Sequence, residues 1–160
     1  MTEELKHYRL HRRLSYQMSL ATKLMQSSLD GALAPQKISL MQWYILAGVE
    51  IENQCSPSDL AAYIGVSRPA VSRLLKSMES DKLIERNIIG EDGRTRMLTL
   101  TDDGREKLHA SWADIQKHEL CFMSKLSTAQ LDALNDIINT LLAGVNVEQS
   151  QSEEPEDEPA

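Results

Sequence analysis

The chain has 160 residues, 41% of them hydrophobic, and a formal net charge of −7. This size fits one ordinary domain or one subunit of a small oligomer. Its apolar runs fall short of the about 20 residues that cross a bilayer, and its polar N-terminus is unlike a secretory signal, so we expect a cytoplasmic protein that does not contact a membrane. Cys55 and Cys121 lie at no metal-ligand or redox-pair spacing, so we expect reduced thiols, no metal and no cofactor.

The first predicted helix covers residues 5–30. Its apolar side chains recur at helical spacing and form a stripe wider than one small domain needs to bury. The stripe consists of Leu10, Leu14, Met18, Ala21, Met25 and Leu29, and Leu20 and Leu24 widen it. A basic cluster that includes His11 and Arg12 precedes this stripe and is interpreted as a solvated face of the helix.

A second helix is predicted over residues 40–47, after Ala34-Pro35 interrupts the chain and Ser39 provides a helix start. This segment is apolar almost all round, so we expect it to be buried between the other elements. Trp43 and Tyr44 carry polar atoms, and a buried aromatic side chain of that kind usually needs a hydrogen-bond partner.

Two helices separated by a tight turn follow. Ser56 and Pro57 start the first, and Gly65 suits the left-handed residue that ends it. Ser67 is predicted to cap the second, which turns Val71, Leu74, Leu75 and Met78 inward. Its outward face is small and cationic, with Pro69, Ser72, Arg73 and Lys76 on it and Arg68 at its edge. Such a face suits the major groove of DNA, and an ordinary solvated face is the alternative.

A β-hairpin is predicted next, because residues 83–89 and 96–101 are β-branched runs that flank Gly90-Glu91-Asp92-Gly93. Arg94 lies just past the tip, where an arginine can enter the minor groove, and Asp92 is placed to orient it. Arg86 and Arg96 are expected to lie near the DNA backbone or to pin the hairpin. A hairpin after a helix-turn-helix is typical of a winged helix-turn-helix.

The last two helices are predicted from their caps. Thr101 starts a long helix with Leu108, Trp112 and Ile115 on its apolar stripe, and Ser127-Thr128-Ala129-Gln130 is a capping box before an apolar helix. His109 and His118 on the long helix are interpreted as surface histidines. Apolar helices at both ends of the chain predict a homodimer in which they intertwine. Its recognition helices would lie about 34 Å apart and prefer a pseudo-palindromic duplex.

The acidic balance of the chain comes mainly from its end. Residues 148–158 hold six acidic side chains and no basic one, so removing them from the net charge of −7 leaves −1 for the rest. Residues 147–160 are predicted to form a disordered acidic tail, either a solubilising end or a segment that covers the basic face and lowers non-specific DNA affinity.

Three motifs resemble the MarR family of transcriptional regulators. They are Leu83-Ile84-Glu85-Arg86, then Asp92-Gly93-Arg94, then Leu98-Thr99-Leu100-Thr101-Asp102-Asp103-Gly104. One position departs from the family, because Lys82 stands where many members have glycine before the first wing strand. The resemblance implies a mainly α fold with a small β-wing. Its parts are an N-terminal dimerisation helix (1–37), a winged helix-turn-helix (38–104), C-terminal dimerisation helices (105–146) and the tail (147–160).

The resemblance also implies the function, a sequence-specific DNA-binding regulator that is most often a repressor. The residues expected to serve DNA binding are Ser67, Arg68, Pro69, Ser72, Arg73, Lys76, Arg86, Asp92, Arg94 and Arg96. Release by a small aromatic or phenolic effector is implied as well. The candidate lining residues are His11, Arg12, Tyr16, Trp43 and Tyr44. The alternative for the three aromatic side chains is a place in the core.

No catalytic motif is found: the sequence has no phosphate loop, nucleophile elbow or pair of metal ligands at helical spacing. We therefore expect no enzymatic activity. Two alternatives stay open beside the repressor, an activator of the same fold and a winged-helix module that binds proteins instead of DNA. The outward cations argue against the second, because a protein-binding face would more often expose aromatic side chains or methionine.

Overall fold

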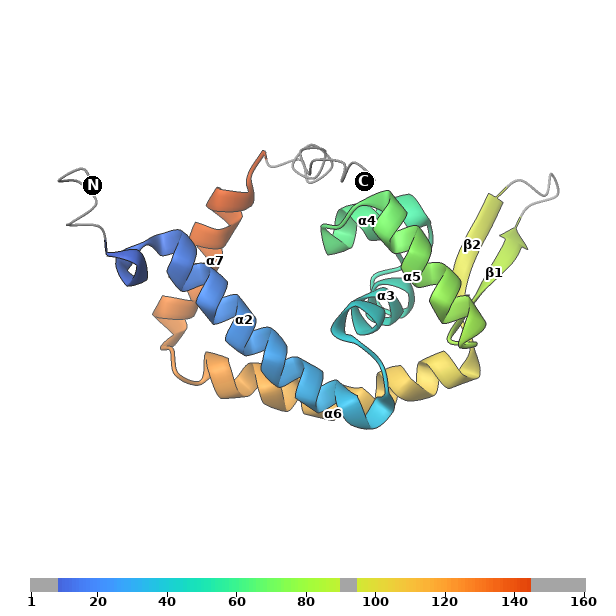
Figure 1. The fold of residues 1–160 in the computed structure, drawn as a ribbon, viewed down its shortest axis with the longest axis horizontal. Helices are drawn as coiled ribbons and strands as arrows, with labels where there is room; N and C mark the ends of the chain where they lie inside the picture. The colour runs from blue at the N-terminus through green and yellow to red at the C-terminus, as the bar shows by residue number, and fades with distance from the viewer. Residues whose placement is uncertain (1–8, 90–94, 145–160) are drawn as a thin grey trace, which may run out of the picture.

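The computed structural model describes residues 9–89 and 95–144 and is mainly helical, with one two-stranded sheet. The elements are η1 (Leu10–Arg12), α2 (Leu14–Leu33), η2 (Ala34–Gln36), α3 (Leu40–Glu50), α4 (Pro57–Ile64), α5 (Arg68–Ser80), β1 (Ile84–Ile89), β2 (Thr95–Leu100), α6 (Asp102–Met123) and α7 (Thr128–Leu142). In Figure 1, α3, α4, α5, β1 and β2 form one lobe, called the winged lobe. Helix α6 leads away from this lobe toward α2 and α7. These last two helices are together called the helical arm. The predicted fold class is confirmed.

The first helix differs from its prediction over residues 5–30. Residues 5–8 lie outside the described part, Leu10–Arg12 form a 3-10 turn, and Arg13 is extended at φ −79° and ψ 129°. The α-helix then runs from Leu14 to Leu33, beyond the predicted end. Apolar periodicity placed the stripe correctly, but it carries no signal for where a helix starts when no capping residue precedes it.

The predicted caps are confirmed at four of five positions. Ser39 with Gln42 and Ser127 with Gln130 form complete capping boxes, and Ser56 and Thr101 accept the amide protons of Asp59 and Gly104. Ser67 occupies the N-cap position of α5, but its side chain makes no capping bond. Pro69 follows two residues later and has no N–H, so one of the two amides that a capping side chain can reach is missing.

The core of the winged lobe is built around α3, as the sequence predicts. Ile45 and Leu46 are fully buried, as are Leu60, Leu75 and Met78 of the helix-turn-helix. Trp43 has the polar partner that its burial calls for, since its Nε1 donates to Ser111 Oγ on α6 at 3.0 Å. This bond and the shared apolar contacts fix the winged lobe against α6.

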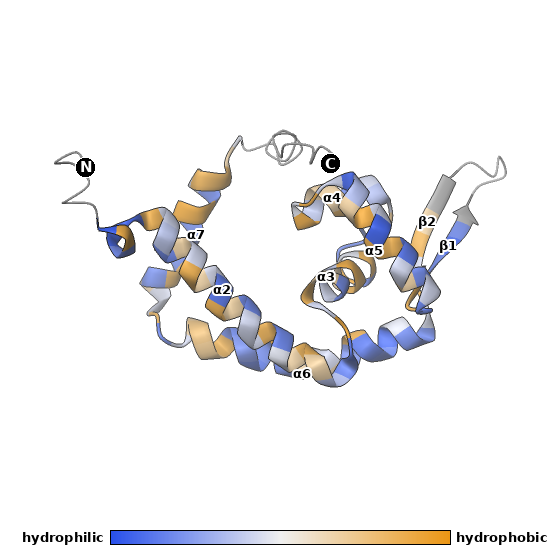
Figure 2. Ribbon diagram, in the orientation of Figure 1, coloured by the Kyte–Doolittle hydropathy of each residue, from blue (hydrophilic) through white to orange (hydrophobic). Residues whose placement is uncertain are grey.

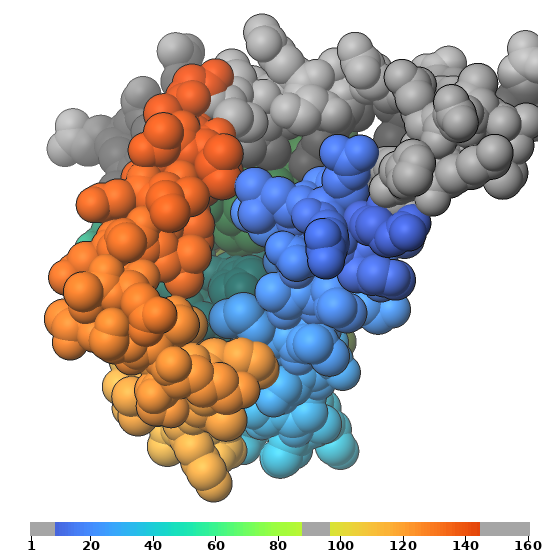
Figure 3. Space-filling model, turned by 90° about the vertical axis from the view of Figure 1, so that its left-hand side faces the viewer, coloured from blue at the N-terminus to red at the C-terminus, as the bar shows by residue number. Residues whose placement is uncertain are grey.

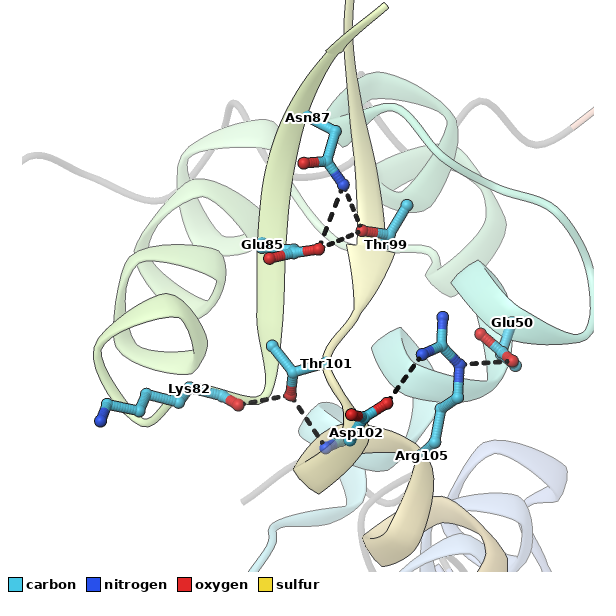
Figure 4. A network of polar contacts seen from close by, with 9 residues as sticks. Glu50, Lys82, Glu85, Asn87, Thr99, Thr101, Asp102 and Arg105 are labelled. Atoms are coloured by element: carbon cyan, nitrogen blue, oxygen red, sulfur yellow. Dashed lines mark hydrogen bonds and ion pairs between the residues drawn. The ribbon is translucent and has the colours of Figure 1, made fainter.

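The wing is antiparallel, with Ile84 opposite Leu100 and Ile89 opposite Thr95, and both strands lie within one residue of their predicted ends. Lys82 takes a left-handed conformation, at φ 57°, which glycine adopts at lower cost than other residues. Behind this bend, the Thr101 hydroxyl donates to the Lys82 carbonyl oxygen (Figure 4). Gly104 lies against the same bend, because a Cβ there would sit 2.0 Å from the Leu83 carbonyl oxygen.

The helical arm exposes large apolar side chains that the winged lobe does not cover. Leu14 and Leu24 of α2 are 62% and 58% exposed, and Ile137 and Leu142 of α7 are 56% and 62% exposed. Figure 2 shows hydrophobic residues along both helices, and Figure 3 shows α2 (blue) and α7 (red-orange) on either side of a hollow. None of the described helices is long and apolar enough to cross a membrane.

One histidine on α6 is placed wrongly by the sequence analysis. His109 is exposed, as expected, but His118 is 7% exposed and neither of its ring nitrogens has a hydrogen-bond partner. Its ring packs against Phe122, with the ring centroids 4.9 Å apart. The correction follows from helix geometry, since Leu108, Ser111, Ile115 and His118 recur every three or four residues on the buried face of α6.

Candidate nucleic-acid interface

Helix α5 presents the predicted recognition face to solvent. Val71, Leu75 and Met78 are fully buried, which fixes the rotation of the helix about its axis. Outward lie Arg68, Pro69, Ser72, Arg73 and Lys76, all exposed, with Ser67 half-buried at the start. In Figure 1, α5 lies on the outer side of α3 and beside the wing. A helix held in this way offers short hydroxyls and long cations on a single face, as groove binding requires.

The wing carries four further predicted residues. Asp92 and Arg94 lie outside the described residues, and Arg96 stands on β2 at the position opposite Ile88. The fourth, Arg86, has an ion pair within the protein, because its Nε lies 2.7 Å from Glu79 Oε1 at the end of α5. Of the two roles expected for Arg86, this contact favours pinning the wing to the recognition helix.

Two polar contacts stabilise the winged lobe and were missed by the sequence analysis. On the sheet, the Asn87 amide donates to Thr99 Oγ1 at 2.7 Å and to Glu85 Oε1 at 3.2 Å (Figure 4). At the junction with α6, Arg105 Nε lies 3.0 Å from Glu50 Oε1. Cross-strand alternation could have suggested the first contact. The second joins residues 55 positions apart and leaves no sequence signal.

Four of the five predicted effector residues form two separate aromatic pairs within the chain. His11 and Tyr16 meet edge to face with centroids 6.2 Å apart, and Trp43 and Tyr44 do so at 6.0 Å. The first pair stands where η1 meets α2, at the far left of Figure 1, whereas the second stands on α3 in the winged lobe. The remaining residue, Arg12, is exposed beside the first pair.

The aromatic residues of α3 have an electrostatic and a stacking partner on α6. Burial raises the pKa of the Tyr44 phenol, and the Glu119 carboxylate raises it further because it disfavours a second negative charge nearby. Trp43 stacks on Trp112 with the rings 24° from parallel and centroids 6.3 Å apart. Trp43 and Tyr44 therefore lie where the winged lobe joins α6.

Other chemistry is limited in the part of the chain that the structure describes. Its histidine, cysteine, aspartate and glutamate side chains form no group of three that could hold a metal ion. Cys55 is half-buried and Cys121 is exposed, and both are free thiols.

Comparisons with known proteins agree with this architecture. The model of the MarR family matches residues 36–95. The uncharacterized HTH-type transcriptional regulator YdgJ of Bacillus subtilis is 28% identical over 94 residues, which cover 59% of this chain and 57% of YdgJ. The aligned region thus spans less than two thirds of that relative.

Solved structures extend the likeness to the helical arm. The MepR–DNA complex of S. aureus aligns with a TM-score of 0.76 at 23% identity, over 84% of this chain and 97% of MepR. CouR from Rhodococcus jostii RHA1, solved with p-coumaroyl-CoA, aligns with a TM-score of 0.75 at 15% identity, over 86% and 97% of the two chains. At these identities the alignments establish a shared fold.

Proposed function

We propose that this chain, whose residues 36–95 match the model of the MarR family, is a sequence-specific DNA-binding transcriptional regulator of that winged helix-turn-helix family. The observation that carries the proposal is the outward face of α5. Its exposed Ser72, Arg73 and Lys76 lie on a helix whose opposite side is buried in the core. MepR, which shares the fold, was solved with DNA.

The regulator acts as a homodimer. The exposed apolar side chains of α2 and α7 support this, since a patch of that kind on a soluble monomer is unfavourable. A two-fold axis through the arms would present two α5 helices to successive major grooves, about 34 Å apart, and select a pseudo-palindromic operator. Arg94, oriented by Asp92, would add a minor-groove contact on each side.

Repression released by a small aromatic molecule is the form of regulation we favour. CouR, of the same fold, was solved with p-coumaroyl-CoA. A ligand releases DNA only when it binds better to a dimer whose recognition helices are wrongly spaced. The same protein would act as an activator if its operator lay where the bound dimer assists transcription. We infer no enzymatic role and a cytoplasmic location, because the proposed partner is DNA.

A mobility-shift titration tests the proposal. The purified protein is titrated against labelled DNA from upstream of its own gene at several salt concentrations, with unlabelled competitor DNA present. We expect retarded DNA that resists competitor and weakens steeply with salt, because cation contacts to phosphates release counterions. Absence of binding at low salt would contradict the proposal and favour the protein-binding alternative.

A further inference from the structure

A carboxylate borders the cationic outward face of α5. Glu79 lies in the last turn of this helix, and its side chain is half-buried. At about 100° per residue, Glu79 stands about 20° around the helix from Ser72 and about 60° from Lys76. Its negative charge therefore lies at the edge of the surface proposed to meet DNA, where an unpaired carboxylate would repel the phosphates.

The wing turns Arg86 toward this carboxylate. Side chains alternate along a strand, so Arg86 shares a face of β1 with Ile84, which is 2% exposed. Its partner in the register is Leu98, which is also buried. Glu85 and Asn87 belong to the other face, where they bond to each other. The face that carries Arg86 is thus the inner one, and α5 packs against this strand (Figure 1).

Glu79 and Arg86 form a close ion pair across the entry to the wing. Arg86 Nε lies 2.7 Å from Glu79 Oε1, and the two side chains are 32% and 31% exposed. Between them the chain passes through the left-handed bend at Lys82. Together the two side chains carry no net charge, so the pair adds little to the attraction between the protein and DNA phosphates. This distinguishes Arg86 from the outward cations of α5.

We propose that Glu79 and Arg86 serve DNA binding as a pair, a step that rests on the proposed function. Arg86 neutralises the carboxylate that would otherwise repel phosphates beside α5, and it holds the wing against the recognition helix. Arg86 is then a positioning residue that acts through Glu79 and makes no phosphate contact of its own. An exposed ion pair contributes little to folding, so the effect of this pair is expected in DNA binding.

A double-mutant cycle separates the pair from a direct phosphate contact. Affinity for the DNA from upstream of the gene is measured for the unchanged chain, Arg86→Ala, Glu79→Gln and the double variant. We expect Arg86→Ala alone to lower the affinity about tenfold, because Glu79 is then an unpaired charge beside phosphates. In the Glu79→Gln background the same substitution should cost less than about threefold, since no carboxylate remains to be neutralised. Equal costs in the two backgrounds would refute the proposal.

Arg73→Ala is the matched control for this cycle. Arg73 is exposed on the outward face of α5 and stands about 120° around the helix from Glu79. Its substitution should therefore cost the same affinity with Glu79 as with Gln at position 79. A cost that depends on Glu79 as strongly as that of Arg86→Ala would indicate a general effect of local charge and would overturn the proposed pairing.

The salt dependence of binding gives a readout that a loss of folding would not mimic. The unchanged pair and the double variant both carry no net charge at these two positions, so the logarithm of affinity should fall with the logarithm of salt at the same slope. If Arg86 contacted a phosphate, the slope of the double variant would be shallower by about one. Denaturation midpoints of all variants should stay close to that of the unchanged chain. A shallower slope, or affinities that fall in step with stability, would contradict the proposal.

The pair is also tested without DNA, by NMR of the Arg86 Nε–H group. Its resonance is assigned from its absence in Arg86→Lys, because lysine has no guanidinium. Glu79→Gln should move this resonance, whereas Glu85→Gln, which removes a charge from the other face of β1, should leave it in place. A resonance that ignores Glu79→Gln would refute the pair. If the protein binds no DNA at all, the proposed function fails and the role of the pair fails with it, whereas equal costs with DNA binding intact refute the role of the pair alone.

Discussion

The winged lobe and the helical arm differ in how they bury their apolar side chains. Residues of α3, α4, α5 and the wing seal a common core in which Ile45, Leu46, Leu75 and Met78 have no exposed surface. On α7 no residue is buried, and Leu134, Ile137, Leu141 and Leu142 are open to solvent. The same chain therefore contains a lobe with its own buried core and an arm whose apolar side chains would be covered by the second copy of the proposed homodimer.

This difference predicts opposite sensitivities in the two regions. Substitutions in the winged lobe act on folding of the single chain, whereas substitutions on the arm act on assembly and, through the spacing of the two recognition helices, on operator binding. The largest effect is expected where the arm is most exposed and most apolar.

Ile137→Asp is expected to abolish dimerisation, because it places a charge in the middle of the apolar face of α7, where Ile137 is 56% exposed in the single chain. Operator affinity should fall more than about a hundredfold, since one recognition helix alone loses half of the contacts. Sedimentation measures the oligomeric state. Asn139→Asp is the matched control, as this exposed position faces away from Ile137 on the same helix. A dimeric Ile137→Asp protein would contradict the assignment of the interface.

Gly104→Ala is expected to destabilise the winged lobe, because the added Cβ would lie 2.0 Å from the Leu83 carbonyl oxygen and would push the first wing strand off α6. We expect a loss of about 2–4 kcal/mol of unfolding free energy, in the range of severe overpacking. The same substitution in the arm is the control. Gly31→Ala meets no atom within 4 Å and should stabilise α2 by about 0.5–1 kcal/mol. Chemical denaturation of both variants measures the contrast, and equal effects would contradict it.

The winged lobe was predictable from sequence because its signals are local. Ser39, Ser56 and Thr101 each mark a helix start through a bond to the amide three residues away. The spacing of Val71, Leu75 and Met78 sets the outward face of α5 before any tertiary contact is known. Lys82 was noted only as a departure from glycine, which did not determine the bend before the wing, and the structure gives this residue a left-handed φ of 57°.

The features that could not be predicted from the sequence depend on contacts between segments that are far apart in the chain. The Glu79–Arg86 ion pair requires knowing how α5 packs on β1, and the Glu50–Arg105 ion pair requires knowing how α3 meets α6. His118 is an intermediate case. Its place beside Ser111 and Ile115 on the buried face of α6 could have been read from the helical period, but a polar residue was taken as an outward one.

Arg73→Ala tests whether DNA binding depends on the outward face of α5 in the winged lobe. Arg73 is exposed on the outward face of α5, so its removal should leave folding and dimerisation intact and cost about 1–3 kcal/mol of operator binding. Lys117→Ala removes an equal charge from an exposed position on α6, outside the winged lobe, and should change operator affinity little. Mobility shifts at matched salt compare the two. Equal losses would indicate a general charge effect rather than recognition by α5.

The smallest expected effect concerns pH at the junction of the two regions. Burial and the Glu119 carboxylate raise the pKa of Tyr44 in the folded chain. Because the folded pKa is raised, the phenol of the unfolded chain ionises first as pH rises, near pH 10. The contribution of Tyr44 to the free energy of unfolding is therefore complete below that pH, and it is lost as pH rises through the folded pKa. Unfolding free energy should therefore decline above about pH 10, and Tyr44→Phe should flatten that decline. Glu119→Gln should flatten it less, because burial is the larger cause. Denaturation curves of the three proteins between pH 8 and 11 measure this, and a decline that is as steep in Tyr44→Phe would assign it to other groups.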